Sequence, residues 1–244
     1  MRPERVGAAG DGAVVLVMAK APVPGFAKTR LAATVGPRAA ADLATDSLLD
    51  TLAAAAGTGW PVVVAFTGKL DSVPCADELR KALARCLVIE QRGRGLGERL
   101  AAAHADAADA AAAAVAGPAG RPTAVVQIGS DTPQVESADL VAAHDRLAGH
   151  DAVLGPARDG GWWLLATRQP AVADCLETVP MSRADTGART MRALGAAGWR
   201  TGRTRRMRDV DTARDAEAVA RLAPASRFAA RWVDRGRATV SGQP

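Results

Sequence analysis

The chain has no tyrosine, few aromatic residues of any kind and little lysine. Aromatic residues make up 3% of the 244 positions, and only four of the 31 basic residues are lysines. With so few rings, and no zinc-finger or RNP-type motif, the sequence argues against a protein that stacks nucleic-acid bases. We therefore expect no nucleic-acid partner. The net charge of +5 and the pI near 9.7 favour a small phosphorylated ligand instead.

Cysteine is also scarce, and long apolar runs are missing. The three cysteines, Cys75, Cys86 and Cys175, form no CxxC pair and are odd in number. This argues against a disulfide scaffold or a zinc ribbon and fits a reducing cytosol. No apolar run reaches the roughly 18 residues that span a bilayer. The first 20 residues lack the long apolar segment and the cleavage site of a signal peptide. We expect a cytoplasmic protein without a membrane span.

Short β-branched runs alternate with Ala-rich stretches along most of the chain. The expected strands cover 13–18, 61–66, 86–90, 123–128, 152–154, 162–167 and part of 200–207, and the expected helices cover 37–56, 76–85, 96–115, 137–147, 185–197 and 212–222. This alternation predicts a three-layer α/β/α sandwich with a mostly parallel central sheet. We expect a flexible N-terminus over 1–12, one domain over 13–222, and a C-terminal helix and tail over 223–244.

A basic loop follows the first predicted strand. In open α/β sheets, ligands bind at the carboxyl ends of the strands. The loop at 19–30 carries Lys20, Lys28 and Arg30, together with two prolines and a glycine. Free backbone N–H groups in such a loop, together with these charges, favour anion binding. The loop contains neither GxxxxGK[ST] nor GxGxxG, so an ordinary solvated basic loop is the alternative.

Two acidic segments follow strands far apart in the sequence. The tripeptide Gly129-Ser130-Asp131 comes directly after the run 124–128, and Asp211 lies just before the helix expected from residue 212. Mg²⁺ prefers one or two carboxylates together with phosphates and water, so both are candidate metal ligands. Asp131 has an alternative role as a helix cap or in an Asx turn. Asp211 has an alternative role as a helix-dipole partner.

A glycine turn precedes the strand expected at 162–167. Its residues Asp159, Gly160 and Gly161 allow a ligand to approach the backbone closely, because glycine has no Cβ. A bare hairpin turn is the alternative interpretation. Trp162 and Trp163 should point to opposite faces of the strand, which leaves one for the core and one free to stack on a ligand.

Taken together, these segments resemble a known superfamily. The loop from Lys20 to Leu31, Gly129-Ser130-Asp131, Gly155-Pro156, Asp159-Gly160-Gly161 and Asp209-Val210-Asp211-Thr212 occur in the order seen in GT-A-like nucleotide-diphospho-sugar transferases. The sequence is most similar to a bacterial branch described as glycosyltransferases, some linked with arsenosugar biosynthesis. It also resembles 2-phospho-L-lactate guanylyltransferase, which shares the Lys28-Thr29-Arg30-Leu31 type of segment. The resemblance covers roughly residues 13–222 and implies a GT-A-like fold.

The resemblance also implies roles for individual residues. Nucleotide contacts would come from Ala19, Lys20, Gly25, Lys28, Arg30, Gln91, Gly95 and Ser130, and substrate contacts from Asp159, Gly160, Gly161 and Trp162. Asp131 and Asp211 would hold Mg²⁺ or Mn²⁺, and Lys28 and Asp131 would be the catalytic pair. The sequence departs from the family at Gly129, where glycosyltransferases usually carry the first Asp of Asp-x-Asp. The loop at 19–30 is also poorer in glycine than in most nucleotidyltransferases.

These departures leave the type of reaction open. The first expectation is a metal-dependent glycosyltransferase that uses a nucleotide-diphospho-sugar and a small-molecule acceptor. The alternatives are a nucleotidylyltransferase that joins an NTP to a phosphorylated small molecule, and a non-catalytic nucleotide-binding accessory protein. The three cysteines lie outside the clusters, and His104, His144 and His150 fall in or next to predicted helices. A covalent catalytic triad is therefore not expected. The sequence names neither the base, the sugar nor the acceptor, and it does not indicate the oligomeric state.

Overall fold

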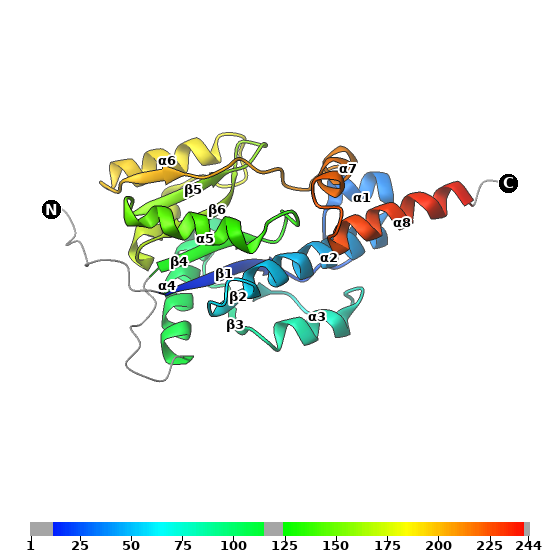
Figure 1. The fold of residues 1–244 in the computed structure, drawn as a ribbon, viewed down its shortest axis with the longest axis horizontal. Coiled ribbons are helices and arrows are strands. Elements are labelled where there is room, and N and C mark those ends of the chain that lie inside the picture. Colours follow the sequence, from blue (N-terminus) through cyan, green and yellow to red (C-terminus); the bar gives the residue numbers. More distant parts are fainter. Residues whose placement is uncertain (1–11, 115–123, 242–244) are drawn as a thin grey trace.

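The computed structural model describes residues 12–114 and 124–241, and within them one seven-stranded sheet forms the centre of the molecule (Figure 1). The strands are β1 (Ala13–Lys20), β2 (Val62–Thr67), β3 (Leu87–Glu90), β4 (Ala124–Gly129), β5 (Ala152–Pro156), β6 (Trp162–Thr167) and β7 (Thr201–Arg203). Their order across the sheet is β3-β2-β1-β4-β6-β5-β7. Every described pair is parallel except the two that involve β6, which runs antiparallel to β4 and β5. The predicted mostly parallel sheet is confirmed.

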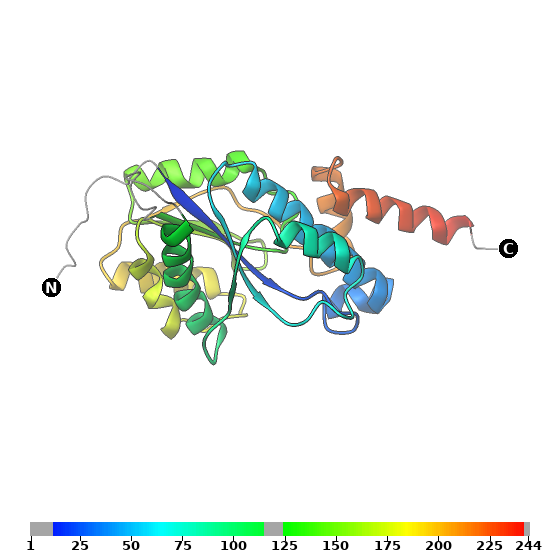
Figure 2. The same cartoon turned by 90° about the horizontal axis from the view of Figure 1, so that it is seen from below.

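Helices cover both faces of this sheet. They are α1 (Thr29–Val35), α2 (Pro37–Ala56), α3 (Ala76–Leu83), α4 (Leu96–Ala114), α5 (Ser137–Asp145), α6 (Thr186–Ala196), α7 (Ala213–Leu222) and α8 (Arg227–Ser241), with 3₁₀ turns at Arg146–Ala148 and Pro170–Thr178. Figure 2 shows α4 and α5 on opposite sides of the sheet. The three-layer α/β/α arrangement predicted from the alternation of strands and helices is therefore present.

The first strand shows why this layering follows from the sequence. Residues 13–17 of β1 are all fully buried, because helices cover both of its faces. Val15 and Val17 pack in the core beneath α2 and α5. Val14 and Leu16 pack on the opposite face, against the alanines of α4. An alternating apolar and polar strand would have placed polar groups in one of these two cores.

The structure departs from the expected elements at the ends of several strands. Residues 29–35, for which the sequence predicted no helix or strand, form the short helix α1. Its buried Leu31 packs in the cluster that joins α2, α7 and α8. The basic strand expected within 200–207 is only three residues long, and a single bridge from Ala157 to Met207 follows it. Tertiary packing, which local sequence patterns do not encode, decides these short elements.

The C-terminal segment packs on the N-terminal helices. Phe228 and Trp232 of α8 are buried against α2 and α7 in the same cluster. The predictions for positions 1–11, for the strand and helix ends at 115 and 123, and for 242–244 lie outside the described residues. In the part of the chain that is described, no helix is both long enough and apolar enough to cross a membrane.

Alanine substitution at two helical glycines should change the free energy of unfolding in opposite directions. In a helix, alanine is normally more stable than glycine by about 1 kcal/mol. At Gly97 of α4, however, a Cβ would lie 2.3 Å from the backbone oxygen of Leu176, so we expect Gly97→Ala to destabilise the fold by about 1–3 kcal/mol. At Gly195 of α6 nothing lies within 4 Å, so Gly195→Ala should stabilise it by up to about 1 kcal/mol. Urea unfolding of both variants measures the difference, and two changes of equal sign would contradict it.

Because one histidine is buried in its neutral form, we expect the folded protein to lose stability in acid. His104 of α4 is fully buried, its Nδ1 donates to the carbonyl oxygen of Leu100, and burial lowers its pKa to about 4. As the pH falls from 6.5 to 4, the unfolded chain takes up a proton that the folded chain does not. Folding stability therefore decreases through this window, by at most about 1.4 kcal/mol per pH unit from this group. The His104→Leu variant should show a flatter dependence in unfolding curves measured between pH 4 and 7.

Candidate functional site

The loop after β1 presents its charged side chains at the carboxyl edge of the sheet. Lys20 is the last residue of β1, and the backbone N–H of Ala21 donates to the carbonyl of Thr67, which keeps the loop at the end of β2. Ala27 is buried, and Lys28 follows it with a left-handed backbone (φ 47°). The carbonyl of Lys28 accepts the N–H of Ala32, which ties the residue to the first turn of α1. Lys28 is thus held in an uncommon conformation that turns its side chain inward.

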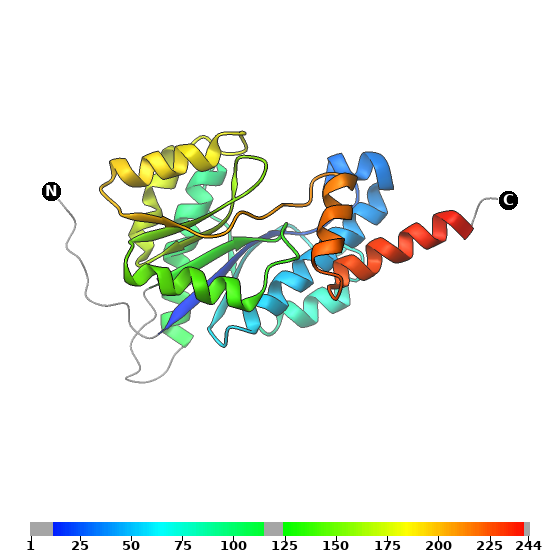
Figure 3. The ribbon, with the colours of Figure 1, turned by 45° about the horizontal axis from the view of Figure 1, so that its top comes forward.

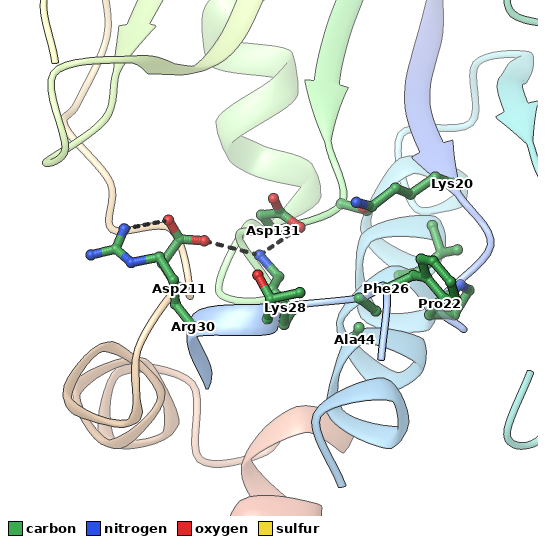
Figure 4. Close-up of a pocket in the computed structure, with 12 residues that line it drawn as sticks. Lys20, Pro22, Phe26, Lys28, Arg30, Ala44, Asp131 and Asp211 are labelled. Atoms are coloured by element: carbon green, nitrogen blue, oxygen red, sulfur yellow. Dashed lines mark hydrogen bonds and ion pairs between the residues drawn. The ribbon is translucent and has the colours of Figure 1, made fainter. Parts of the chain in front are cut away.

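The Lys28 ammonium lies between the two predicted carboxylates (Figure 4). Its Nζ is 2.8 Å from Oδ1 of Asp131 and 3.6 Å from Oδ1 of Asp211. The Lys28 side chain is only 10% exposed, whereas those of Asp131 and Asp211 are 53% and 37% exposed. Nη1 of Arg30 lies 3.3 Å from the second oxygen of Asp211. The structure therefore brings together both predicted carboxylates and two of the three basic loop residues that the sequence singled out, Lys28 and Arg30.

A backbone hydrogen bond aligns the two acidic segments. The N–H of Val210 donates to the carbonyl oxygen of Asp131 at 2.9 Å, and the Val210 side chain is buried. Figure 3 shows how the segment between β7 and α7 crosses the molecule to reach α1. This crossing carries Asp211 to the end of β4, although 80 positions separate it from Asp131.

Asp209 belongs to the segment Asp209-Val210-Asp211-Thr212, but the sequence did not single it out as a site residue. Asp209 is half-buried and lines the cavity next to Asp131 and Asp159. Burial, and then the nearby carboxylates of Asp159 and Asp211, raise its pKa to about 6. The pattern Asp209-Val210-Asp211 could have indicated this position. In an extended segment, a buried valine between two aspartates leaves both carboxylates on the opposite side.

The helix expected over 212–222 begins with a capping box. Asp215 accepts the backbone N–H of Thr212, and the Thr212 hydroxyl oxygen accepts the N–H of Asp215, which makes a capping box at α7. Asp215 also pairs with Arg208. Asp215 therefore stabilises the start of α7, whereas Asp211 contacts Lys28 and Arg30 of the loop and α1.

Two cavities meet at this edge of the sheet. The smaller, about 220 Å³, is formed by the loop after β1 and includes Lys20, Phe26, Lys28, Arg30, Ser130, Asp131 and Asp211. The larger, about 490 Å³, includes Ala19, Gln91, Ser130, Asp159, Gly161, Trp162 and Asp209. Lys20, Ser130 and Asp131 line both cavities. A ligand with a charged part and a less polar part could therefore extend from one to the other.

The structure distinguishes among the predicted nucleotide contacts. Gln91 lines the larger cavity, but its amide nitrogen already donates to the carbonyls of Ala19 and Ala65, so it braces the ends of β1 and β2. Gly25 and Gly95 are not among the residues that line these two cavities. Gly25 has a φ of 84°, which allows the loop to turn ahead of Lys28.

The glycine turn supports the wall of the larger cavity. Gly160 has a φ of 92°, and a Cβ there would lie 1.7 Å from the carbonyl oxygen of Ala184. Its own carbonyl accepts the N–H of Gly187, which seats the start of α6 against the turn. Asp159 accepts the N–H of Gly161. Gly160 therefore acts through packing, while Asp159 and Gly161 line the cavity.

The two tryptophans divide as the alternation along the strand predicts. Trp163 is 3% exposed and donates its indole N–H to the carbonyl of Arg205. Trp162 is half-buried, lines the larger cavity and donates to the hydroxyl of Thr190 in α6. Both rings line the larger cavity, and Trp162 is the more exposed of the two.

The donor set at Lys28 suits a magnesium ion that also binds phosphate. Within residues 12–114 and 124–241 there is no cluster of three or more His, Cys, Asp or Glu side chains built to enclose a metal. Asp131 and Asp211 direct two carboxylates at the point that the Lys28 ammonium occupies. Mg²⁺ commonly takes its other ligands from phosphates and water. The residues fit such an ion provided that the Lys28 ammonium moves toward the phosphates.

Comparison with solved structures defines the class of fold. The chain is similar to a crystal structure from Desulfovibrio desulfuricans G20, described as a putative nucleotide-diphospho-sugar transferase, with 26% identity and a TM-score of 0.79 over 92% of this chain and 95% of that one. The crystal structure of Rv0371c from Mycobacterium tuberculosis H37Rv matches more distantly, with 20% identity, a TM-score of 0.50 and coverage of 86% and 97%. The fold is therefore that of the nucleotide-diphospho-sugar transferases, as the sequence motifs predict.

The family assignment follows from the sequence itself. Residues 49–183, more than half of the chain, match the model of DUF2064, a family described as an uncharacterized protein conserved in bacteria. The chain belongs to this family. A search of the curated proteins gives no match.

Replacing Lys28 should change metal and nucleotide binding in opposite directions. In Lys28→Met the two carboxylates lose their resident cation, so we expect Mn²⁺ to bind at least about tenfold more tightly without nucleotide. Nucleotide diphosphates should bind about tenfold more weakly, because a charged hydrogen-bond donor is lost. Electron paramagnetic resonance of Mn²⁺ and calorimetry measure the two affinities. The exposed Lys81→Met, in α3, is the control, and unchanged affinities in Lys28→Met would remove this residue from the site.

Proposed function

We propose that this protein is a nucleotide-dependent transferase, and specifically a metal-dependent glycosyltransferase that uses a nucleotide-diphospho-sugar. The observation that carries the proposal is the convergence of Asp131 and Asp211 on the single ammonium group of Lys28. This cluster lies at the carboxyl edge of a mostly parallel sheet, where ligands of α/β proteins bind. The similar structure from Desulfovibrio desulfuricans supports the same class.

The acidic and the basic side chains of the site would bind different parts of the substrate complex. Asp131 and Asp211 would hold Mg²⁺ or Mn²⁺, which when bound neutralises the charge that develops on the diphosphate leaving group. Lys28, Lys20 and Arg30 surround the smaller cavity and would bind the remaining phosphate oxygens. Because Lys28 also contacts both carboxylates, it orients the metal ligands before a substrate arrives.

The larger cavity would hold the sugar and the acceptor. Its walls combine Trp162, Leu100 and Met181 with the carboxylates of Asp159 and Asp209. Apolar walls with a few polar groups are typical of sites that orient a small molecule while excluding water. With both substrates fixed at the metal position, positioning and charge stabilisation supply most of the rate enhancement.

Nucleotidylyl transfer is the second candidate. It is favoured by Gly129, which stands where glycosyltransferases usually carry the first Asp of their Asp-x-Asp motif. In this reaction an NTP would react with a phosphorylated small molecule and release pyrophosphate. The same carboxylates and loop would serve, because in both reactions negative charge develops on a diphosphate leaving group, which is a nucleoside diphosphate in glycosyl transfer and pyrophosphate in nucleotidylyl transfer.

One set of incubations separates the two reactions. Purified protein is incubated with Mg²⁺ or Mn²⁺ and either nucleotide sugars, including UDP-glucose and GDP-mannose, or the four NTPs with phosphorylated acceptors. Release of UDP or GDP without NTP turnover supports glycosyl transfer, whereas pyrophosphate release supports nucleotidylyl transfer. Binding of nucleotide without turnover of any of these substrates would support the accessory-protein alternative.

Asp131→Asn should abolish metal-dependent activity and leave the fold intact. The Asp131 side chain is half exposed, so losing its ion pair with Lys28 should cost less than about 1 kcal/mol of stability. We expect activity to fall at least about a hundredfold and Tm to shift by only a few degrees. Activity assays and calorimetry test this, with Asp77→Asn as a control, since Asp77 forms an exposed pair with Arg80 in α3. A large fall in Tm would instead indicate that Asp131 has a structural capping role.

A further inference from the structure

The floor of the larger cavity contains a buried glutamine whose amide oxygen lacks a hydrogen-bond partner among the described residues. Gln127 lies in β4, two residues before the strand ends, and it is 2% exposed. Its amide oxygen makes no hydrogen bond to any atom of the described residues. Thr132 lines the same cavity, is 2% exposed, and its hydroxyl oxygen likewise has no partner there. Two buried polar side chains therefore face one cavity with unused hydrogen-bonding capacity.

Two other glutamines near the site behave differently. The amide nitrogen of Gln91 donates to two backbone carbonyls, and that of Gln134 donates to the carbonyl of Arg208 at 2.6 Å. Both serve the fold through these contacts, although the amide oxygen of Gln134, like that of Gln127, has no partner among the described residues. Gln127 makes no such contact, although its neighbours on the same face of the sheet, such as Leu16 and Val125, are apolar. A valine or leucine would satisfy packing at position 127 without leaving a polar group unpaired.

An unpaired buried amide is costly to folding, so its presence calls for a partner that arrives later. We propose that the Gln127 amide and the Thr132 hydroxyl bind the hydroxyl groups of the glycosyl part of a nucleotide sugar. This inference rests on the proposed function and specifies the group that the larger cavity recognises. A hydroxyl group both donates and accepts hydrogen bonds, as do a primary amide and a threonine hydroxyl.

The position of these residues favours a sugar over a base or a phosphate. Thr132 directly follows Asp131, so a ligand held at the metal position would place the group next to its diphosphate beside Thr132. Trp162 and Met18 line the same cavity and provide the apolar surface that the carbon face of a sugar ring packs against. In the larger cavity the cations of Lys20, Arg99 and Arg183 are balanced by the carboxylates of Asp131, Asp159 and Asp209. Around the smaller cavity the three cations outnumber the two carboxylates, which suits phosphates better.

The test compares Gln127→Met, which keeps the length of the side chain, with Thr167→Val. Thr167 in β6 is also fully buried, and its hydroxyl has no partner among the described residues, but it does not line the cavity, which makes it a matched control. Calorimetry gives the Kd values of each protein for UDP, GDP, UDP-glucose and GDP-mannose in the presence of Mg²⁺. Thermal unfolding gives the stability of each protein without ligand. Thr132→Val is measured in the same way as a second variant.

We expect Gln127→Met to bind the nucleotide sugar at least about tenfold more weakly and the parent diphosphate within twofold of wild type. Its Tm without ligand should be unchanged or higher, because an unpaired amide has been removed. Thr167→Val should match that Tm behaviour and leave all affinities unchanged. Thr132→Val should follow Gln127→Met in affinity.

Three results would overturn the inference. A clear fall in the Tm of ligand-free Gln127→Met with unchanged affinities would show that the amide stabilises the fold and does not bind the ligand. Equal weakening of UDP and UDP-glucose would place the contact on the base or the phosphates, and unchanged sugar affinity in a stable variant would remove the contact altogether. If wild type binds no nucleotide or nucleotide sugar, the proposed function fails. Free glucose and mannose then test the hydroxyl site by itself, which is refuted if neither raises the Tm of wild type more than that of Gln127→Met.

Discussion

The ion pairs of Lys28 unite three segments that are distant in the sequence. The loop after β1, the end of β4 and the segment before α7 each contribute one side chain to this cluster. A left-handed backbone at a residue other than glycine costs about 1–2 kcal/mol, and the surrounding structure must maintain it. The burial of Ala27 and the hydrogen bond from Ala32 do so. The geometry of the candidate site therefore depends on how α1 and its loop are anchored to the sheet.

The segment from β7 to α7 forms the other side of the site. Met207 donates to the carbonyl of Pro156 and accepts from the N–H of Arg158, so the segment extends the sheet beyond β5. Along it, Arg208 pairs with Asp215, while Asp209 lines the larger cavity. Arg208 and Asp209, which carry opposite charges, thus serve opposite sides of this segment. This arrangement concentrates carboxylates toward the cavity and keeps the arginine on the far side.

Much of the fold could be predicted from local patterns in the sequence. The apolar run at 13–18 required a strand covered on both faces, and the capping box at Thr212 and Asp215 marked the start of α7. The short helix α1 could not be predicted, because only its packing through Leu31 against α2 and α8 stabilises seven residues. The antiparallel direction of β6 likewise depends on the turn at 158–161 and not on the composition of the strand.

By itself the sequence determined the chemistry of the site: Lys20, Lys28 and Arg30 in a loop, and aspartates after strands, because charge and residue type are local properties. Only the tertiary structure decided which of these groups meet and which are already in use. It placed Lys28 between two carboxylates, bound the Gln91 amide to the backbone, and left the Gln127 amide oxygen unpaired within the described residues. These outcomes depend on contacts across dozens of positions, which strand order and helix packing fix and local sequence does not.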